Sequence, residues 1–196
     1  RNTLRLKLEL EIAIATGRGT VLDDATICLG HAQESDNSIV IYNDDIKKRI
    51  NERAAWIDRL QEAIENDRVH PFFQGIRNNS TGKIDKYEAL MRIEHEGRFF
   101  VPFFFLDVAI EHGYYQQLTE IMIDKTFAHF AHRTDKVSIN LMLNDLVRAH
   151  FIDFVDAAAK KHNMPLDRVI FELVESQDFD QHPDLVTDMI KQFHEW

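Results

Sequence analysis

Short apolar segments alternate with longer amphipathic segments in the second half of the chain, and this alternation narrows the possible folds more than any other feature. The apolar segments are FFQGI (72–76), KYEALMRI (86–93), KVSINLML (136–143) and RVIFELVE (168–175). Helical patterns cover roughly 104–112, 115–132, 144–162 and 183–196. Strands that alternate with helices of this length predict βα units and a mainly parallel sheet, whose strands are nearly continuous apolar runs because both of its faces are covered.

Three of these strands carry an oxygen-bearing side chain among apolar neighbours: Glu88, Asn140 and Glu172. An unpaired buried carboxylate is costly, so each of these groups needs a partner. Glutamate and asparagine oxygens are hard ligands that suit Mg²⁺ or Mn²⁺, whereas Zn²⁺ favours His or Cys. In α/β barrels the catalytic groups come from the ends of several different strands, which is the distribution seen here.

The stretch YEALMRI adds a cation to this set. Successive side chains of a strand alternate between its faces, so Glu88, Leu90 and Arg92 share one face. A guanidinium at this position suits bidentate binding of a phosphate. The alternative is structural: Arg92 pairs with Glu88 or Glu172, and Asn140 completes a hydrogen-bond network. On spacing alone both interpretations remain open.

The first part of the chain has a different pattern. Residues 4–14 alternate strictly between apolar and polar, residues 22–33 suit a short helix, and residues 38–42 suit a second strand. This small α/β piece has too little chain for a core of its own, so we expect it to be the end of a domain that starts before Arg1. We predict three parts: a domain remnant (1–43), an amphipathic linker helix (44–68) and a βα domain (69–196).

Composition excludes several classes of function. The net charge of -10 over 196 residues argues against binding of long nucleic acid, which requires clustered Lys and Arg. No apolar run approaches the ~20 residues of a transmembrane helix. The single Cys28 suits a reducing cytoplasm. We therefore expect a cytoplasmic location, although a preceding segment could carry a membrane anchor.

The segments FFQGI, YEALMR, VSINL and FELVES, in this order, resemble the EAL-domain family of cyclic di-GMP phosphodiesterases, whose patterns read FQPI, EAL-x-R, VN-x-S and ELTES. Upstream, ATICLGHAQESDNSIVIY resembles the end of a degenerate GGDEF domain. The resemblance implies the first part of a modified (β/α)₈, TIM-like barrel, preceded by an α/β fragment of a GGDEF-like domain and a linker helix. It also implies hydrolysis of cyclic di-GMP to linear pGpG in bacterial second-messenger signalling.

The resemblance also implies roles for individual residues. Glu88, Asn140 and Glu172 match metal ligands of a two-metal site for Mg²⁺ or Mn²⁺, and Arg92 matches the arginine that contacts phosphate. Gln74 and Leu90 match positions that line the dinucleotide site. Glu175, expected with Glu88 to be catalytic, matches a glutamate that steadies a neighbouring loop rather than binding metal. A homodimer through the EAL domain is a further expectation.

Some positions depart from the family patterns: Gly75 replaces a proline, Met142 a serine and Val174 a threonine. The resemblance covers roughly the first half of an EAL barrel, and an Asp-Asp pair, a general-base lysine and a further glutamate are expected beyond Trp196. We therefore expect this segment alone to be inactive. Two alternatives remain: an inactive EAL domain that binds cyclic di-GMP or a protein, and a plain structural α/β module.

Overall fold

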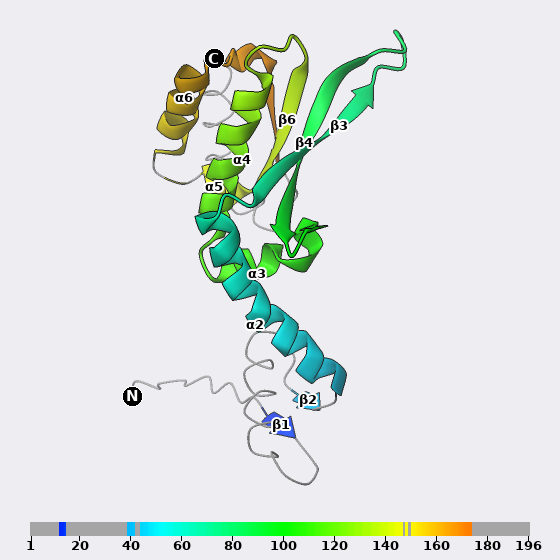
Figure 1. The fold of residues 1–196 in the computed structure, drawn as a ribbon, viewed down its shortest axis with the longest axis vertical. Coiled ribbons are helices and arrows are strands. Elements are labelled where there is room, and N and C mark those ends of the chain that lie inside the picture. The colour runs from blue at the N-terminus through cyan, green and yellow to red at the C-terminus, as the bar shows by residue number, and fades with distance from the viewer. Residues whose placement is uncertain (1–11, 15–38, 42–43, 147, 149, 174–196) are drawn as a thin grey trace, which may run out of the picture. The chain divides into compact units, whose positions relative to one another are not determined.

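The computed structural model describes residues 12–14, 39–41, 44–146, 148 and 150–173 (Figure 1). The chain divides into two compact units, Arg1–Asp58 and Arg59–Trp196. Within the described residues, no helix combines the length and the apolar composition that crossing a membrane requires.

In the first unit, two short strands pair in parallel: β1 (Ile12–Ile14) and β2 (Ile39–Ile41). Both lie inside strands predicted from the sequence, and their β-branched isoleucines favour extended backbone. The remainder of the predicted strand 4–14 and the helix predicted over 22–33 lie outside the described residues. Helix α2 (Asp44–Glu65) begins at the predicted position.

The second unit contains a five-stranded sheet in which β3-β4-β6-β7 are neighbours and β5 pairs with β4. The strands are β3 (Val69–Arg77), β4 (Ile84–His95), β5 (Arg98–Phe100), β6 (Lys136–Leu141) and β7 (Val169–Leu173). β4, β6 and β7 run parallel, which confirms that part of the prediction. β3 and β5 are antiparallel to β4, because short turns can join only antiparallel neighbours.

The contact between β4 and β6 is short. Lys86 to Ala89 of β4 lie opposite Lys136 to Ile139 of β6, and no further pair of these two strands is formed within the described sheet. β4 nevertheless continues to His95 and β6 to Leu141, so the two strands separate beyond the last pair.

Helices follow the strands in the expected order. They are η1 (Pro102–Phe104), α3 (Leu106–Glu111), α4 (Tyr115–Phe130), α5 (Leu143–Leu146), α6 (Phe151–His162) and η2 (Leu166–Arg168). The prediction of one continuous helix over 144–162 is wrong, because helix α5 ends at Leu146 and a separate helix, α6, begins at Phe151. His150 has a φ of 68°, and a left-handed residue cannot continue a right-handed helix.

The core lies between the sheet and α4, which packs beside β3, β4 and β6 (Figure 1). The side chain of Phe130 is fully buried there, and its ring centroid lies 5.0 Å from that of Phe73 and 5.7 Å from that of Tyr87. Ala89 and Ile139 are buried as well. Because side chains alternate along a strand, the intervening residues point to the opposite face of the sheet.

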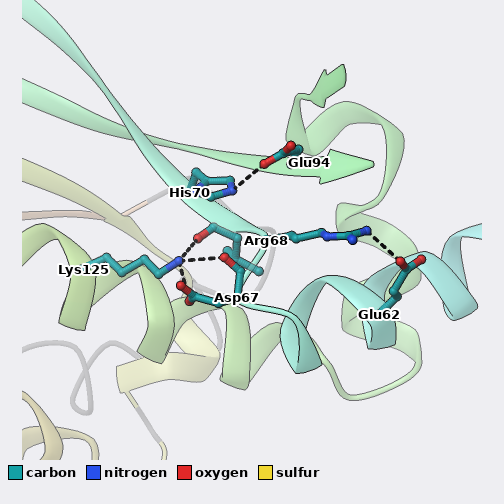
Figure 2. Close-up of polar contacts among 7 residues, drawn as sticks. Glu62, Asp67, Arg68, His70, Glu94 and Lys125 are labelled. Atoms are coloured by element: carbon teal, nitrogen blue, oxygen red, sulfur yellow. Dashed lines mark hydrogen bonds and ion pairs between the residues drawn. The ribbon is translucent and has the colours of Figure 1, made fainter. Parts of the chain in front are cut away.

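Lys125 of α4 holds the turn between α2 and β3 (Figure 2). Its ammonium donates to the carbonyl oxygens of Asp67 at 3.1 Å and Val69 at 2.7 Å, and it lies 2.6 Å from the Asp67 carboxylate. The next residue, Arg68, pairs with Glu62 of α2 at 2.7 Å. These contacts tie the start of β3 to α4 and to the last turn of α2.

Lys125→Met should therefore lower the free energy of unfolding by about 2–3 kcal/mol, because charge-assisted hydrogen bonds contribute ~1.5–3 kcal/mol. Urea denaturation followed by far-UV circular dichroism measures this difference. The matched control is Lys161→Met, which removes a 61% exposed lysine that pairs with Asp124 and should cost at most ~1 kcal/mol. Equal losses in the two variants would contradict the anchoring role of Lys125.

Candidate active site

The polar residues predicted inside the strands lie on one face of the sheet. Residues directly opposite each other on paired strands present their side chains to the same face. Glu88 of β4 lies opposite Gln74 of β3 on one side and Ser138 of β6 on the other. Asn140 of β6 lies opposite Glu172 of β7. Four candidate residues from four neighbouring strands thus share the face that points away from α4.

Glu88 and Asn140 are in direct contact. The amide Nδ2 of Asn140 donates to Oε1 of Glu88 at 2.9 Å across the parallel pair β4–β6. Glu88 is half-buried and Asn140 is exposed, so a ligand can approach this pair from solvent. The hydrogen bond uses Oε1 of Glu88 and Nδ2 of Asn140, so the amide oxygen of Asn140 takes no part in it.

Glu172 is held by a lysine that the sequence reasoning missed. Lys86 Nζ lies 2.6 Å from Glu172 Oε1, and the two side chains are 26% and 39% exposed. The hydrogen bond from Lys86 lowers the pKa of the Glu172 carboxyl below its usual range, against the opposing effect of burial and with help from the Ser138 side chain. The alternation of side chains along a strand could have pointed to Lys86, because it places Lys86 on the same strand face as Glu88.

Arg92 takes part in neither of the ion pairs considered above. Its Nη1 donates to the carbonyl oxygen of Met91 at 2.7 Å, and its guanidinium carbon lies 5.6 Å from the centroid of the Phe72 ring. The alternative in which Arg92 pairs with Glu88 or Glu172 is therefore wrong, whereas the hydrogen bond that it expected from Asn140 is present and goes to Glu88.

A cavity of about 130 Å³ opens where β4 and β6 separate. Leu90, Arg92 and Asn140 contribute to its lining, together with residues of η1, α3 and α4 that include the hydroxyl-bearing Tyr115 and Thr119. Three of the predicted site residues thus line one cavity, whereas Gln74, Glu88 and Glu172 are not among its lining residues. A mainly apolar pocket with a few polar groups is the usual form of a small-molecule site.

A pair of polar side chains, a half-buried tyrosine and a buried aspartate, supports this cavity. Tyr115 of α4 donates its hydroxyl to Asp145 of α5 at 2.8 Å, and the same carboxylate accepts the backbone N–H of Met142 at 2.9 Å. Burial raises the pKa of both the Tyr115 hydroxyl and the Asp145 carboxyl. The pair fixes the chain just after Asn140, and sequence reasoning gave no indication of it because its members come from separate helices.

The remaining candidates are placed as follows. Gln74 is exposed on β3 opposite Glu88, and Leu90 lines the cavity. Glu175 lies outside the described residues.

Among the described residues, no group of three or more His, Cys, Asp or Glu side chains is arranged to hold a metal ion. The candidate residues Glu88, Asn140 and Glu172 are not a group of that type, because Asn140 is an asparagine. Its amide oxygen is nevertheless also a hard ligand. Glu88 touches Asn140, and Glu172 lies opposite Asn140 on the next strand. Three oxygen donors on neighbouring strands fit Mg²⁺ or Mn²⁺, while Lys86 neutralises one of them.

A core of parallel strands with antiparallel first strands, helices on one face and oxygen-bearing side chains on the other defines an α/β-barrel type of domain. The profile of the EAL domain family matches residues 57–195. The chain therefore belongs to the EAL domain family.

Solved structures have the same fold. The PaMucR phosphodiesterase in complex with c-di-GMP is 22% identical to this chain, with a TM-score of 0.65. The match covers 72% of this chain and 60% of the PaMucR chain. The Xanthomonas citri FimX EAL domain in complex with c-di-GMP is 18% identical with a TM-score of 0.65, over 75% and 59%. The Vibrio cholerae LapD S helix-GGDEF-EAL protein bound to c-di-GMP is 16% identical with a TM-score of 0.62, over 93% and 46%.

At these identities the likeness establishes the fold, and the predicted partial barrel-like α/β architecture is confirmed. This chain spans 60% or less of the length of those three structures.

Proposed function

We propose that the complete domain is a metal-dependent phosphodiesterase that hydrolyses cyclic di-GMP to linear pGpG in bacterial second-messenger signalling. The observation that carries the proposal is the convergence of Glu88, Asn140 and Glu172 on one face of three neighbouring parallel strands. Membership of the EAL family supports the choice of substrate.

Glu88, Asn140 and Glu172 would hold the divalent ions, Mg²⁺ or Mn²⁺, of a two-metal site. When bound, such ions lower the pKa of water and neutralise charge on a phosphate under in-line attack. The contribution of the protein is rigid placement: each ligand lies on a strand paired with its neighbour, so the oxygens are positioned before a substrate arrives. Glu175 would steady a neighbouring loop.

Arg92 would bind a phosphate oxygen of the dinucleotide, and Gln74 and Leu90 would line the same site. The separation of β4 and β6 supports this arrangement, because it leaves room beside Leu90 and Arg92. Arg92 would have to exchange the Met91 carbonyl for the phosphate, which is a stronger acceptor for a guanidinium.

An inactive EAL domain that binds cyclic di-GMP or a protein is the second candidate. The specific observation in its favour is the ion pair between Lys86 and Glu172, since an ammonium already neutralises one proposed metal ligand. A receptor could keep this pair permanently, whereas an enzyme has to open it.

The test is hydrolysis of cyclic di-GMP with Mg²⁺ by a protein extended beyond Trp196 to a complete barrel. Linear pGpG formed with Mg²⁺ and not with a chelator would support the enzyme. Tight binding of cyclic di-GMP without product would support the receptor, and absence of both binding and product would overturn the two candidates together.

Arg92→Ala should weaken binding of cyclic di-GMP about 10- to 100-fold, because one charge-assisted contact contributes ~1.5–3 kcal/mol. Isothermal titration calorimetry with Ca²⁺ in place of Mg²⁺ would measure binding without turnover. The control is Arg77→Ala, which removes an exposed arginine that donates to the Gly82 carbonyl in the β3–β4 turn. A dissociation constant unchanged by Arg92→Ala would remove Arg92 from the binding site.

We further propose the division into a GGDEF-like remnant (1–43), a linker helix (44–68) and an EAL domain (69–196), with a cytoplasmic location. The match to a S helix-GGDEF-EAL protein over 93% of this chain supports the order of these parts. A homodimer through the EAL domain stays a prediction.

A further inference from the structure

Lys86 has an unusual position in the sheet. It lies on β4, and its partner Glu172 lies on β7, with β6 between them. Neighbouring strands are ~4.8 Å apart, so the lysine side chain must extend across the face of β6 to reach the carboxylate. That face carries Ser138, which is opposite Lys86's near neighbour Glu88. The ammonium therefore contacts one candidate metal ligand, Glu172, on the face of the sheet that also carries the other two.

The environment of the pair distinguishes it from a surface ion pair. Lys86 is 26% exposed, whereas exposed pairs of this unit such as Lys160–Asp156 involve a lysine that is 75% exposed. Glu172 also faces Asn140 across the β6–β7 ladder, and Asn140 in turn binds Glu88. Lys86 thus supplies positive charge to a cluster that contains two carboxylates.

We propose that Lys86 is a positioning residue that holds the Glu172 carboxylate in place of the divalent ion, so that ion binding must displace its ammonium. This inference rests on the proposed metal-dependent function. The ion pair between Lys86 and Glu172 competes with the ion and so lowers the affinity of the site for it. When the ion is absent, the same ion pair keeps the Glu172 carboxylate oriented.

Binding of Mn²⁺ to the full-length protein tests this proposal, with electron paramagnetic resonance of free Mn²⁺ as the readout. Lys86→Met should bind Mn²⁺ about tenfold more tightly, because it removes both the competing ion pair and a nearby positive charge. Lys86→Arg retains a cation that can pair with Glu172, so its affinity should stay within about threefold of wild type.

The matched control is Lys136→Met. Lys136 lies directly opposite Lys86 on β6 and presents its side chain to the same face, but it is exposed. The Lys136→Met substitution removes one positive charge from a neighbouring position but leaves the Lys86–Glu172 ion pair in place, so the Mn²⁺ affinity should rise less than about threefold.

Thermal denaturation gives a second readout that does not depend on activity. Without metal, Lys86→Met should melt at a lower temperature than wild type, because Glu172 loses its partner, and saturating Mn²⁺ should raise its melting temperature by more than it raises that of wild type. Equal Mn²⁺ affinity in wild type and Lys86→Met would overturn the role of Lys86 and leave the metal site intact. No Mn²⁺ binding by either protein would overturn the metal-dependent function itself.

Discussion

Glu88→Ala in a complete domain is expected to reduce Mg²⁺-dependent hydrolysis of cyclic di-GMP by about a thousandfold or more, a barrier increase of ~4 kcal/mol. Glu88 is the candidate ligand that contacts another candidate, Asn140, at 2.9 Å. Its loss removes a charged oxygen from the proposed metal site and also leaves the Asn140 amide without that acceptor. The measurement is the initial rate of pGpG formation at saturating Mg²⁺.

The fold should survive this change, because Glu88 is half-buried on the face away from α4 and supports no packing against that helix. Asp85→Ala is the matched control: it removes an exposed carboxylate from the same strand, one that accepts a hydrogen bond from Asn78 near the turn. Its rate should stay within about twofold of wild type, as for an ordinary surface substitution. Hydrolysis that is equal in Glu88→Ala and wild type would exclude Glu88 as a metal ligand.

Phe130→Ala is expected to lower the free energy of unfolding by about 3–5 kcal/mol, the usual cost of truncating a buried phenylalanine. Phe130 is fully buried at the end of α4, where it contacts Phe73 of β3 and Tyr87 of β4. The guanidinium carbon of Arg133 also lies 5.3 Å from its ring centroid. The alanine would leave a cavity at the place where the helix joins two strands.

Urea denaturation measures this loss, and Phe103→Ala provides the comparison. Phe103 in η1 is 88% exposed, so its removal should change the free energy of unfolding by less than ~0.5 kcal/mol. A cost below about 1 kcal/mol for Phe130→Ala would contradict the packing of α4 on the sheet.

Alternation along single strands was sufficient to predict which face Glu88, Leu90 and Arg92 share, because a strand fixes side-chain direction locally. It could not predict the partner of each side chain. Lys86 and Glu172 are 86 positions apart in the sequence, and their contact depends on β6 lying between their strands. The pairing of Arg92 with the Met91 carbonyl is equally invisible in the sequence, since many acceptors are within reach of an arginine.

Helix positions show the same limit. Helix α4 (Tyr115–Phe130) closely matches the predicted range 115–132, because its apolar residues recur at helical spacing. The break between α5 and α6 was missed, because His150 adopts positive φ without the glycine that usually signals such a turn. Strand β5 (Arg98–Phe100) was missed because a strand of three residues is too short to show a period.

The separation of β4 from β6 has a consequence for the peptide groups along the open edge of β4. The N–H of Glu94 points to the β3 side, where it donates to the Arg68 carbonyl, so the Met91 carbonyl points to the other edge. Arg92 satisfies that carbonyl with its own guanidinium. When the guanidinium moves to another acceptor, the peptide group it leaves must be satisfied by water or by the arriving molecule. With Arg92 in its proposed role, a neutral acceptor would offer no gain in this exchange, whereas an anion would. The gap in the sheet would thereby favour anionic ligands over neutral ones of the same shape.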